Sequence, residues 1–178
     1  GSNTTGALGY VEAVGELKEQ MEQTGTSFSH IVFASSSGGT QAGLLAGKIM
    51  FEQQFEIIGI AIDKEENGEE SFDQNVLDLS GKTAERLGLK NHPNREDVVI
   101  RKEYLGGGYG VIGKPESKAI RILAEIEGIL LDPVYTGRAM AGLTDMINRG
   151  EFSRDDNVLF WHTGGTPALF SYSGSLCF

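Results

Sequence analysis

The chain has 178 residues, 39% of them hydrophobic, and a formal net charge of −10 at pH 7. This length can bury one core, so we expect a single domain over residues 1–178. Binding to a nucleic-acid backbone needs clustered Lys and Arg, which this acidic sequence lacks, so nucleic acid is excluded as a partner. Apolar runs such as Ile57–Ile62 are much shorter than the roughly 20 residues of a membrane span, so no membrane segment is expected.

Apolar spacing predicts helices alternating with short strands. The predicted elements are, in chain order, a helix over 8–23, a strand over 30–34, a helix over 39–53, a strand over 56–63, a helix over 71–87, a strand over 98–101, helices over 115–127 and 137–149, and a strand over 158–162. Gly88 is expected to cap a helix C-terminus, and Pro115 marks a helix start. The acidic stretch Asp63–Glu70 predicts a solvated loop leading into a helix. Strand alternating with helix predicts an α/β fold, with a parallel sheet flanked by helices.

Glycine is over-represented: the 25 glycines are about twice the usual ~7%. Clusters at Gly38–Gly39, Gly106–Gly110 and Gly164–Gly165 follow predicted strands, where ligands bind in parallel sheets. The single Cys177 permits no internal disulfide, which fits a reducing, cytoplasmic setting. The three histidines show no metal-ligand spacing, so no metal is expected.

The segment Ser35–Thr40, SSSGGT, stands between a predicted strand and a predicted helix. Free N–H groups at a helix start, glycines and hydroxyls together can hold a phosphate without Lys or Arg. The segment matches neither the GxxxxGK[ST] phosphate loop nor the GxGxxG dinucleotide fingerprint. By itself the pattern leaves open a plain turn with Ser caps.

Longer motifs resemble one known family. They are the Gly1–Glu12 stretch, the Gly-Thr-Gln-Ala-Gly turn over Gly39–Gly43, the Gly108–Gly110 loop, EGILLDPVYTGRAM over Glu127–Met140 and HTGGTPALF over His162–Phe170. Together these resemble the D-cysteine desulfhydrase and 1-aminocyclopropane-1-carboxylate (ACC) deaminase family, which is dependent on pyridoxal 5'-phosphate (PLP). The resemblance implies the large domain of the tryptophan-synthase-β-like fold and a homodimer.

The resemblance also implies site residues. The phosphate loop corresponds to Ser36, Ser37, Gly38, Gly39 and Thr40, and two active-site tyrosines correspond to Tyr109 and Tyr135. Either tyrosine is a candidate base if its pKa is depressed, and a surface or packing role is the alternative for each. The family's Schiff-base lysine lies in an N-terminal Ser-x-Asn-Lys-type motif, and none of the eight lysines here follows such a motif. The resemblance therefore implies that this chain is the C-terminal part of a longer enzyme, and that the chain alone is inactive.

Two threonines, Thr136 and Thr163, are the candidates to lie beside the pyridine nitrogen of PLP. A hydroxyl there makes a weaker electron sink than a carboxylate, which favours loss of a β leaving group. ACC deaminases carry Glu and Leu at these positions. The implied reaction is therefore the conversion of D-cysteine to pyruvate, sulfide and ammonia. ACC deamination and a non-catalytic phosphate- or PLP-binding module are the alternatives, while an NAD enzyme lacks its fingerprint.

Overall fold

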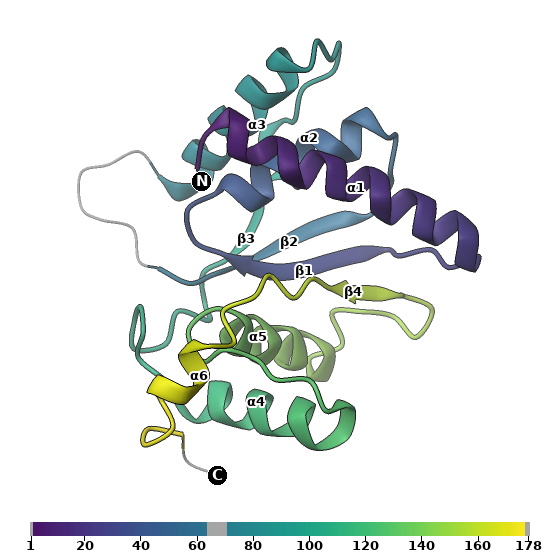
Figure 1. Cartoon of the computed structure of the whole chain (residues 1–178). Coiled ribbons are helices and arrows are strands. Elements are labelled where there is room, and N and C mark those ends of the chain that lie inside the picture. The colour runs from purple at the N-terminus through teal and green to yellow at the C-terminus, as the bar shows by residue number, and fades with distance from the viewer. Residues whose placement is uncertain (1, 64–70, 177–178) are drawn as a thin grey trace. The chain divides into compact units, whose positions relative to one another are not determined.

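The computed structural model describes residues 2–63 and 71–176, and it confirms the predicted α/β class. Four parallel strands are ordered β3-β2-β1-β4 and are flanked by helices (Figure 1). The strands are β1 (His30–Ser35), β2 (Glu56–Ala61), β3 (Val99–Arg101) and β4 (Val158–Phe160). The Glu56 amide donates to Ser29 O at 2.8 Å, and the Ile62 amide donates to Ser35 O at 3.0 Å. Both pairs have the same offset along the chain, which is the register of parallel strands.

The strand order places β1 between β2 and β4. The chain thus builds outward from β1 on one side, through β2 and β3, and later returns with β4 to the other side. Such a reversal is the point of a parallel sheet where ligands bind, outside the carboxyl ends of the strands. The segment after β1 begins with Ser36, and the segment after β4 contains Thr163. The two predicted ligand segments therefore follow the strands that form the reversal.

The described residues form two compact units. Unit 1 comprises Gly1–Ile31, Ser37–Ile58 and Glu65–Val99, and unit 2 comprises Val32–Ser36, Gly59–Lys64 and Ile100–Phe178. Unit 1 contains α1 (Thr4–Thr24), α2 (Gly39–Met50), α3 (Phe72–Arg86) and the short 3-10 helix η1 (Arg95–Asp97). Unit 2 contains α4 (Lys114–Glu127), α5 (Thr136–Asn148) and α6 (Ala168–Ser171).

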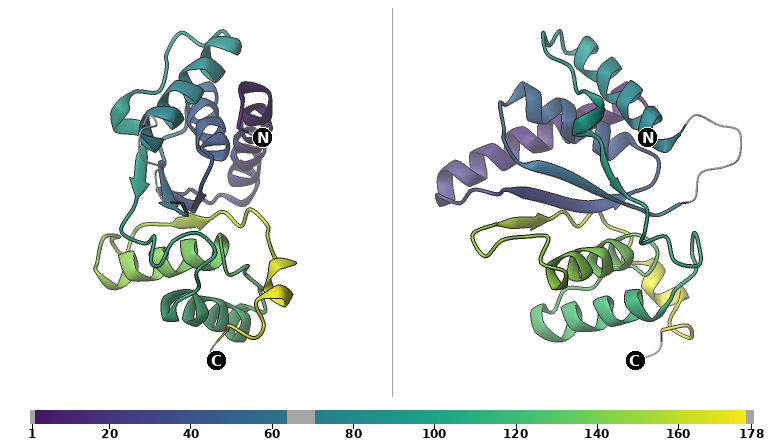
Figure 2. Two further views of the ribbon diagram at one scale, coloured as in Figure 1. Left: turned by 90° about the vertical axis from the view of Figure 1, so that its left-hand side faces the viewer. Right: turned by 180° about the vertical axis from the view of Figure 1, so that it is seen from behind.

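In unit 1, α1 and α2 approach closely along two glycines of α2 (Figure 2). A Cβ placed on Gly43 would lie 2.3 Å from the carbonyl oxygen of Ala7. A Cβ placed on Gly47 would lie 2.9 Å from the Cβ of Val14. Because glycine has no side chain, the backbones of α1 and α2 can approach each other closely at these two positions.

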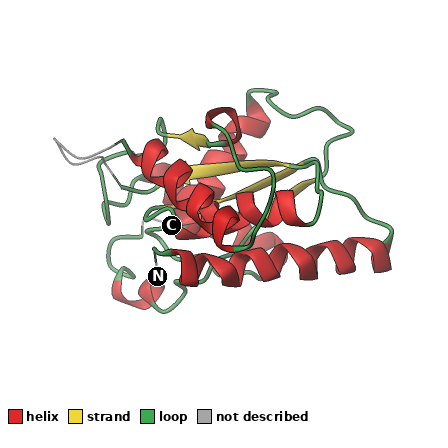
Figure 3. Cartoon of the chain, turned by 90° about the horizontal axis from the view of Figure 1, so that it is seen from above, coloured by secondary structure: helices red, strands yellow, loops and turns green. Residues whose placement is uncertain are grey.

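In unit 2, α5 packs against β2 and against α4. A Cβ on Gly142 of α5 would lie 3.1 Å from the Cδ1 atom of Ile60 in β2, and one on Gly137 would lie 3.0 Å from the Cγ1 atom of Ile120 in α4. Viewed from above, the helices and the strands between them can be followed by colour (Figure 3). Within residues 2–63 and 71–176, no helix is long and apolar enough to cross a membrane.

Each predicted helix and strand is present, with shifted ends. The first helix begins at Thr4 rather than at residue 8, because the side chain of Asn3 accepts a hydrogen bond from the Gly6 amide and caps it. Gly88 adopts the predicted left-handed conformation, at φ 67°, directly after the C-cap residue of α3. The short helices η1 and α6 are too brief to produce apolar periodicity. Most of the acidic Asp63–Glu70 stretch lies outside the described residues.

Candidate functional site

The predicted phosphate loop runs from the carboxyl end of β1 to the start of α2. Gly38 is the N-cap residue of α2, and no side chain caps this helix start. The first amide N–H groups of a helix have no partner within the helix, and they carry partial positive charge. These amides, in Gly39 and Thr40, suit an anion. Ser36 is half-buried and Ser37 is exposed, which leaves hydroxyl donors at the same turn.

Glycine is required at position 38 for two reasons. Its φ of 82° lies in the left-handed region, and a Cβ there would lie 3.0 Å from the Cγ2 atom of Val76 in α3. The turn can therefore bend tightly against α3 while its amides remain available. Loop geometry and donor chemistry both fit a phosphate group.

The two predicted active-site tyrosines contact each other in unit 2. The Tyr109 hydroxyl lies 2.6 Å from the Tyr135 hydroxyl, and the rings meet edge to face, with centroids 5.9 Å apart. Tyr109 comes from the glycine-rich loop after β3 and is 52% exposed, while Tyr135 is the N-cap residue of α5. Residues 26 positions apart in the sequence thus form one hydroxyl pair.

The surroundings of Tyr135 favour its protonated form. The hydrogen bond with Tyr109, burial and the nearby carboxylates of Asp132 and Asp63 raise the pKa of Tyr135 to about 12. A phenol with a raised pKa holds its proton at neutral pH. The predicted role of Tyr135 as a base needs a depressed pKa, and its surroundings in this structure raise the pKa instead; its catalytic role stays a prediction.

A buried carboxylate organises the start of α5. Asp132 is fully buried, and its two oxygens accept hydrogen bonds from the amides of Val134, Tyr135 and Thr136 at 2.7–2.9 Å. The Thr136 hydroxyl donates to the same carboxylate at 2.8 Å and accepts from the Asp132 amide at 2.9 Å. Thr136 is also fully buried, so its hydroxyl has a structural role here. Its predicted contact with the cofactor ring stays a prediction.

The turn after β4 lies against this carboxylate. A Cβ on Gly165 would lie 2.7 Å from the Cγ atom of Asp132. His162 is fixed in the turn, with Nε2 3.0 Å from the Leu130 carbonyl oxygen and Nδ1 accepting from the Gly164 amide at 3.2 Å. This agrees with a structural histidine. Thr163 is exposed at the tip of the turn, so of the two threonines it is the accessible one.

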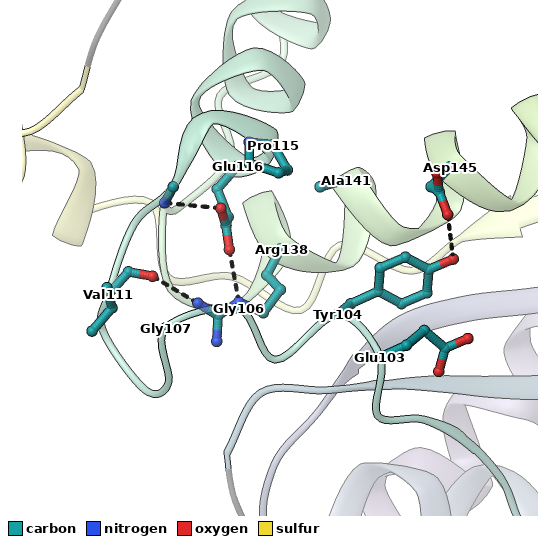
Figure 4. A pocket seen from close by; sticks show the side chains of 11 residues that line it. Glu103, Tyr104, Gly106, Gly107, Val111, Pro115, Glu116, Arg138, Ala141 and Asp145 are labelled. Atoms are coloured by element: carbon teal, nitrogen blue, oxygen red, sulfur yellow. Dashed lines mark hydrogen bonds and ion pairs between the residues drawn. The ribbon is translucent and has the colours of Figure 1, made fainter.

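A cavity of about 340 Å³ is lined by the glycine-rich loop after β3, by the start of α4 and by α5 (Figure 4). Its wall includes Tyr104, whose hydroxyl donates to Asp145 at 2.9 Å, and the buried pair of Arg138 and Glu116. Burial and the bond to Asp145 raise the pKa of Tyr104 to about 12. Among the residues described, no group of three or more His, Cys, Asp or Glu side chains forms a metal site.

Three buried charged residues were not predicted to have a role in the site: Asp132, Arg138 and Glu116. Asp132 had a usable signal, because an Asp followed by Pro just before a helix is typical of a capped helix start. No sequence pattern predicts the burial of Arg138 and Glu116, because charged residues in an amphipathic helix are usually exposed.

The family of pyridoxal-phosphate-dependent enzymes matches residues 1–164. D-cysteine desulfhydrases from Klebsiella pneumoniae subsp. pneumoniae and Yersinia enterocolitica are 41% and 42% identical over 97% of the chain. A crystal structure of an ACC deaminase homologue superposes with a TM-score of 0.87 at 38% identity, covering 99% of the chain and 50% of that structure. A fungal L-serine ammonia-lyase from Rhizomucor miehei, at 18% identity and a TM-score of 0.59, shares the fold.

The fold is that of the tryptophan-synthase-β-like class of PLP-dependent enzymes. The chain belongs to the pyridoxal-phosphate-dependent enzyme family, and within it is similar to the D-cysteine desulfhydrases and ACC deaminase homologues. It spans about half the length of the curated relatives that it matches.

Proposed function

We propose that the protein containing this chain is a PLP-dependent lyase that converts D-cysteine and water to pyruvate, hydrogen sulfide and ammonia. The observation that carries the proposal is the hydroxyl pair of Tyr109 and Tyr135, 2.6 Å apart, on two loops of a chain similar to D-cysteine desulfhydrases. A protonated hydroxyl pair suits a reaction in which a sulfur atom leaves and needs a proton.

The phosphate turn supplies the anchor. Amides at the start of α2, in Gly38, Gly39 and Thr40, and the hydroxyls of Ser36 and Ser37 would hold the PLP phosphate. PLP, when bound, draws electrons from the α-carbon of an amino acid and so acidifies its α-proton. Thr163, exposed on the turn after β4, would present a neutral hydroxyl to the ring nitrogen.

The tyrosine pair would serve the leaving group. Tyr109 is exposed and can reach a small substrate, and its hydroxyl shares a proton with Tyr135. When Tyr109 gives a proton to the departing sulfur, Tyr135 can replace it across 2.6 Å. The raised pKa of Tyr135 means that its phenol is protonated at neutral pH, and water would return the proton that it gives up. A different group, the Schiff-base lysine of the family, is the better candidate to remove the α-proton.

The choice of substrate rests on Thr136 and Thr163, where the resemblance gives ACC deaminases Glu and Leu. Sulfide release from D-cysteine and ammonia release from ACC, both measured on the full-length enzyme, separate the two substrates. Turnover of D-cysteine alone is the expected result. Turnover of ACC alone would contradict the assignment, and turnover of neither, with PLP bound, would favour the non-catalytic module.

We also infer from the resemblance that the enzyme is a cytoplasmic homodimer. Light scattering of the purified full-length protein measures the mass of the assembly. A mass of two subunits is expected, and a mass of one subunit would contradict the inference. Fractionation of cells that express the protein tests its location.

A further inference from the structure

Arg138 is a buried cation to which the proposed chemistry assigns no role. It lies in the first turn of α5, three residues after Tyr135, and only 1% of its side chain is exposed. Its Nε atom lies 2.9 Å from Oε1 of Glu116, whose side chain is 6% exposed. A buried ion pair of this kind contributes little net stability compared with well-packed apolar side chains. The geometry of the pair therefore points to a purpose other than stability.

The guanidinium of Arg138 reaches three segments of unit 2. Besides Glu116 at the start of α4, it donates to the carbonyl oxygen of Ile62, just past β2, at 3.1 Å. It also donates to the carbonyl oxygen of Val111 at 2.7 Å (Figure 4). A planar guanidinium, with five donors in fixed directions, suits three acceptors that lie on different sides of it. The cation thus joins the end of a strand, the start of a helix and the loop that carries Tyr109.

Glu116 completes the attachment of that loop. Its second carboxylate oxygen accepts a hydrogen bond from the Gly113 amide at 2.9 Å. The ion pair therefore holds the loop at Val111 and at Gly113, two and four residues after Tyr109. On the other side of Tyr109, the loop is glycine-rich and follows β3 directly.

The loop is held internally by turns, in which the amides of Leu105, Gly108 and Val111 donate to the carbonyl oxygens of Lys102, Leu105 and Gly108. Gly106, Gly108 and Gly110 all have positive φ, at 55°, 117° and 70°, and no helix or strand covers residues 102–113. Glycines in such conformations leave the unfolded loop many alternatives. The direction in which Tyr109 points depends also on contacts made from outside the loop. Tyr135, the N-cap residue of α5, meets the Tyr109 hydroxyl, and within α5 Arg138 binds the Val111 carbonyl and Asp145 binds the Tyr104 hydroxyl.

We propose that Arg138, held by Glu116, is a positioning residue that fixes the Tyr109 loop so that the Tyr109 hydroxyl meets that of Tyr135. Arg138 acts through the loop and does not touch the substrate. The expected effect of Arg138 on turnover rests on the proposed function. The expected effect of Arg138 on the loop does not depend on any reaction.

The test uses Arg138→Lys and Glu116→Gln in the full-length enzyme, with Arg121→Lys as the matched control. Lys keeps the charge but cannot reach three acceptors, and Gln keeps the shape of Glu but removes the ion pair. Arg121 makes an exposed pair with Glu125 in α4, so its replacement should change nothing. We expect kcat for D-cysteine to fall by about tenfold to a hundredfold with little change in KM, as for a displaced catalytic group.

A double variant separates positioning from a general structural role. In a Tyr109→Phe background, Arg138→Lys should cause little further loss of kcat, because the hydroxyl that it positions is already gone. An equal loss in both backgrounds would overturn the proposal. If Arg138→Lys does not fold, Glu116→Gln carries the same comparison.

Two readouts need no turnover. Amide hydrogen exchange over residues 105–113 should quicken by about tenfold in the Arg138 and Glu116 variants, while exchange in α1 stays unchanged. The pKa of Tyr135, raised first of all by its bond to Tyr109, should fall as that contact loosens. Unchanged exchange and an unchanged pKa would contradict the proposal. If the wild-type enzyme turns over no D-cysteine, the proposed function fails, and these two readouts still decide the role of Arg138.

Discussion

The hydroxyls of Tyr109 and Tyr135 lie 2.6 Å apart, one on a glycine-rich loop and the other at the first residue before α5. Each tyrosine has a different support. Asp132 holds the backbone of Tyr135 through its amide, and the Arg138 guanidinium holds the loop of Tyr109 through Val111. The pair therefore depends on two buried charged residues that touch neither phenol.

Removing either hydroxyl of the pair should lower turnover. If the pair moves a proton, Tyr109→Phe and Tyr135→Phe should each reduce kcat/KM for D-cysteine by about 10²–10⁴. The double variant should lose about as much as the worse single variant, because the two hydroxyls act as one unit. Tyr10→Phe, which changes a tyrosine of α1 in unit 1, is the control and should stay near wild-type activity. Losses that multiply in the double variant would show that the hydroxyls act separately.

The raised pKa of Tyr135 predicts a defined alkaline titration. The folded state binds the phenolic proton more tightly than the unfolded chain, whose pKa is 10.0. The stabilisation is thus present below pH 10.0 and is lost as the pH rises through about 12. In Tyr109→Phe, the largest cause is absent, so the pKa of Tyr135 should move down toward 10.0. Ultraviolet titration of phenolate formation measures this shift.

Tyr104 is the reference for that titration. Its pKa is also about 12, for reasons that do not involve Tyr109, so the Tyr104→Phe variant removes the overlapping signal. The measurement is best made in that background. An identical titration with and without the Tyr109 hydroxyl would show that the pair is not formed in solution.

The approach of Gly165 to Asp132 predicts a sensitive position. Gly164→Ala and Gly165→Ala both place a side chain at positive φ, 102° and 93°, which costs about 1–3 kcal/mol. Only Gly165→Ala also drives a Cβ to within 2.7 Å of the buried Asp132 carboxyl carbon. We expect it to lose a further ~1–3 kcal/mol of unfolding free energy. Urea unfolding of both variants measures the difference, and equal losses would rule out the contact.

Two helix glycines, Gly43 in α2 and Gly81 in α3, predict opposite effects of substitution by Ala. Gly43→Ala places a Cβ 2.3 Å from the Ala7 carbonyl oxygen, so α1 and α2 must separate, and about 1–3 kcal/mol should be lost. Gly81→Ala in α3 meets nothing within 4 Å and should stabilise the protein by about 0.5–1 kcal/mol. Thermal unfolding of the two variants should therefore shift in opposite directions. A gain of stability in Gly43→Ala would contradict the close packing.

The fold class and the order of elements could be read from the sequence because apolar periodicity records which faces are buried. The continuous apolar run over Glu56–Asp63 predicted a covered strand, and β2 is buried along nearly its whole length. The ends of elements were less predictable, as α1 shows, because a side-chain cap such as Asn3 adds residues that carry no apolar pattern. The motifs also placed the phosphate turn and Tyr109 on segments that follow strands, and Tyr135 directly before a helix.

The sequence alone determined the family, the parallel α/β order and the identity of the candidate site residues, since local patterns and motifs carry that information. Tertiary structure decided how these residues are used. It joined Tyr109 to Tyr135, buried Thr136 against Asp132 while leaving Thr163 exposed, and turned Arg138 inward to hold three segments. Contacts between distant residues depend on how loops fold back on one another, and the spacing of residues along a chain does not record that.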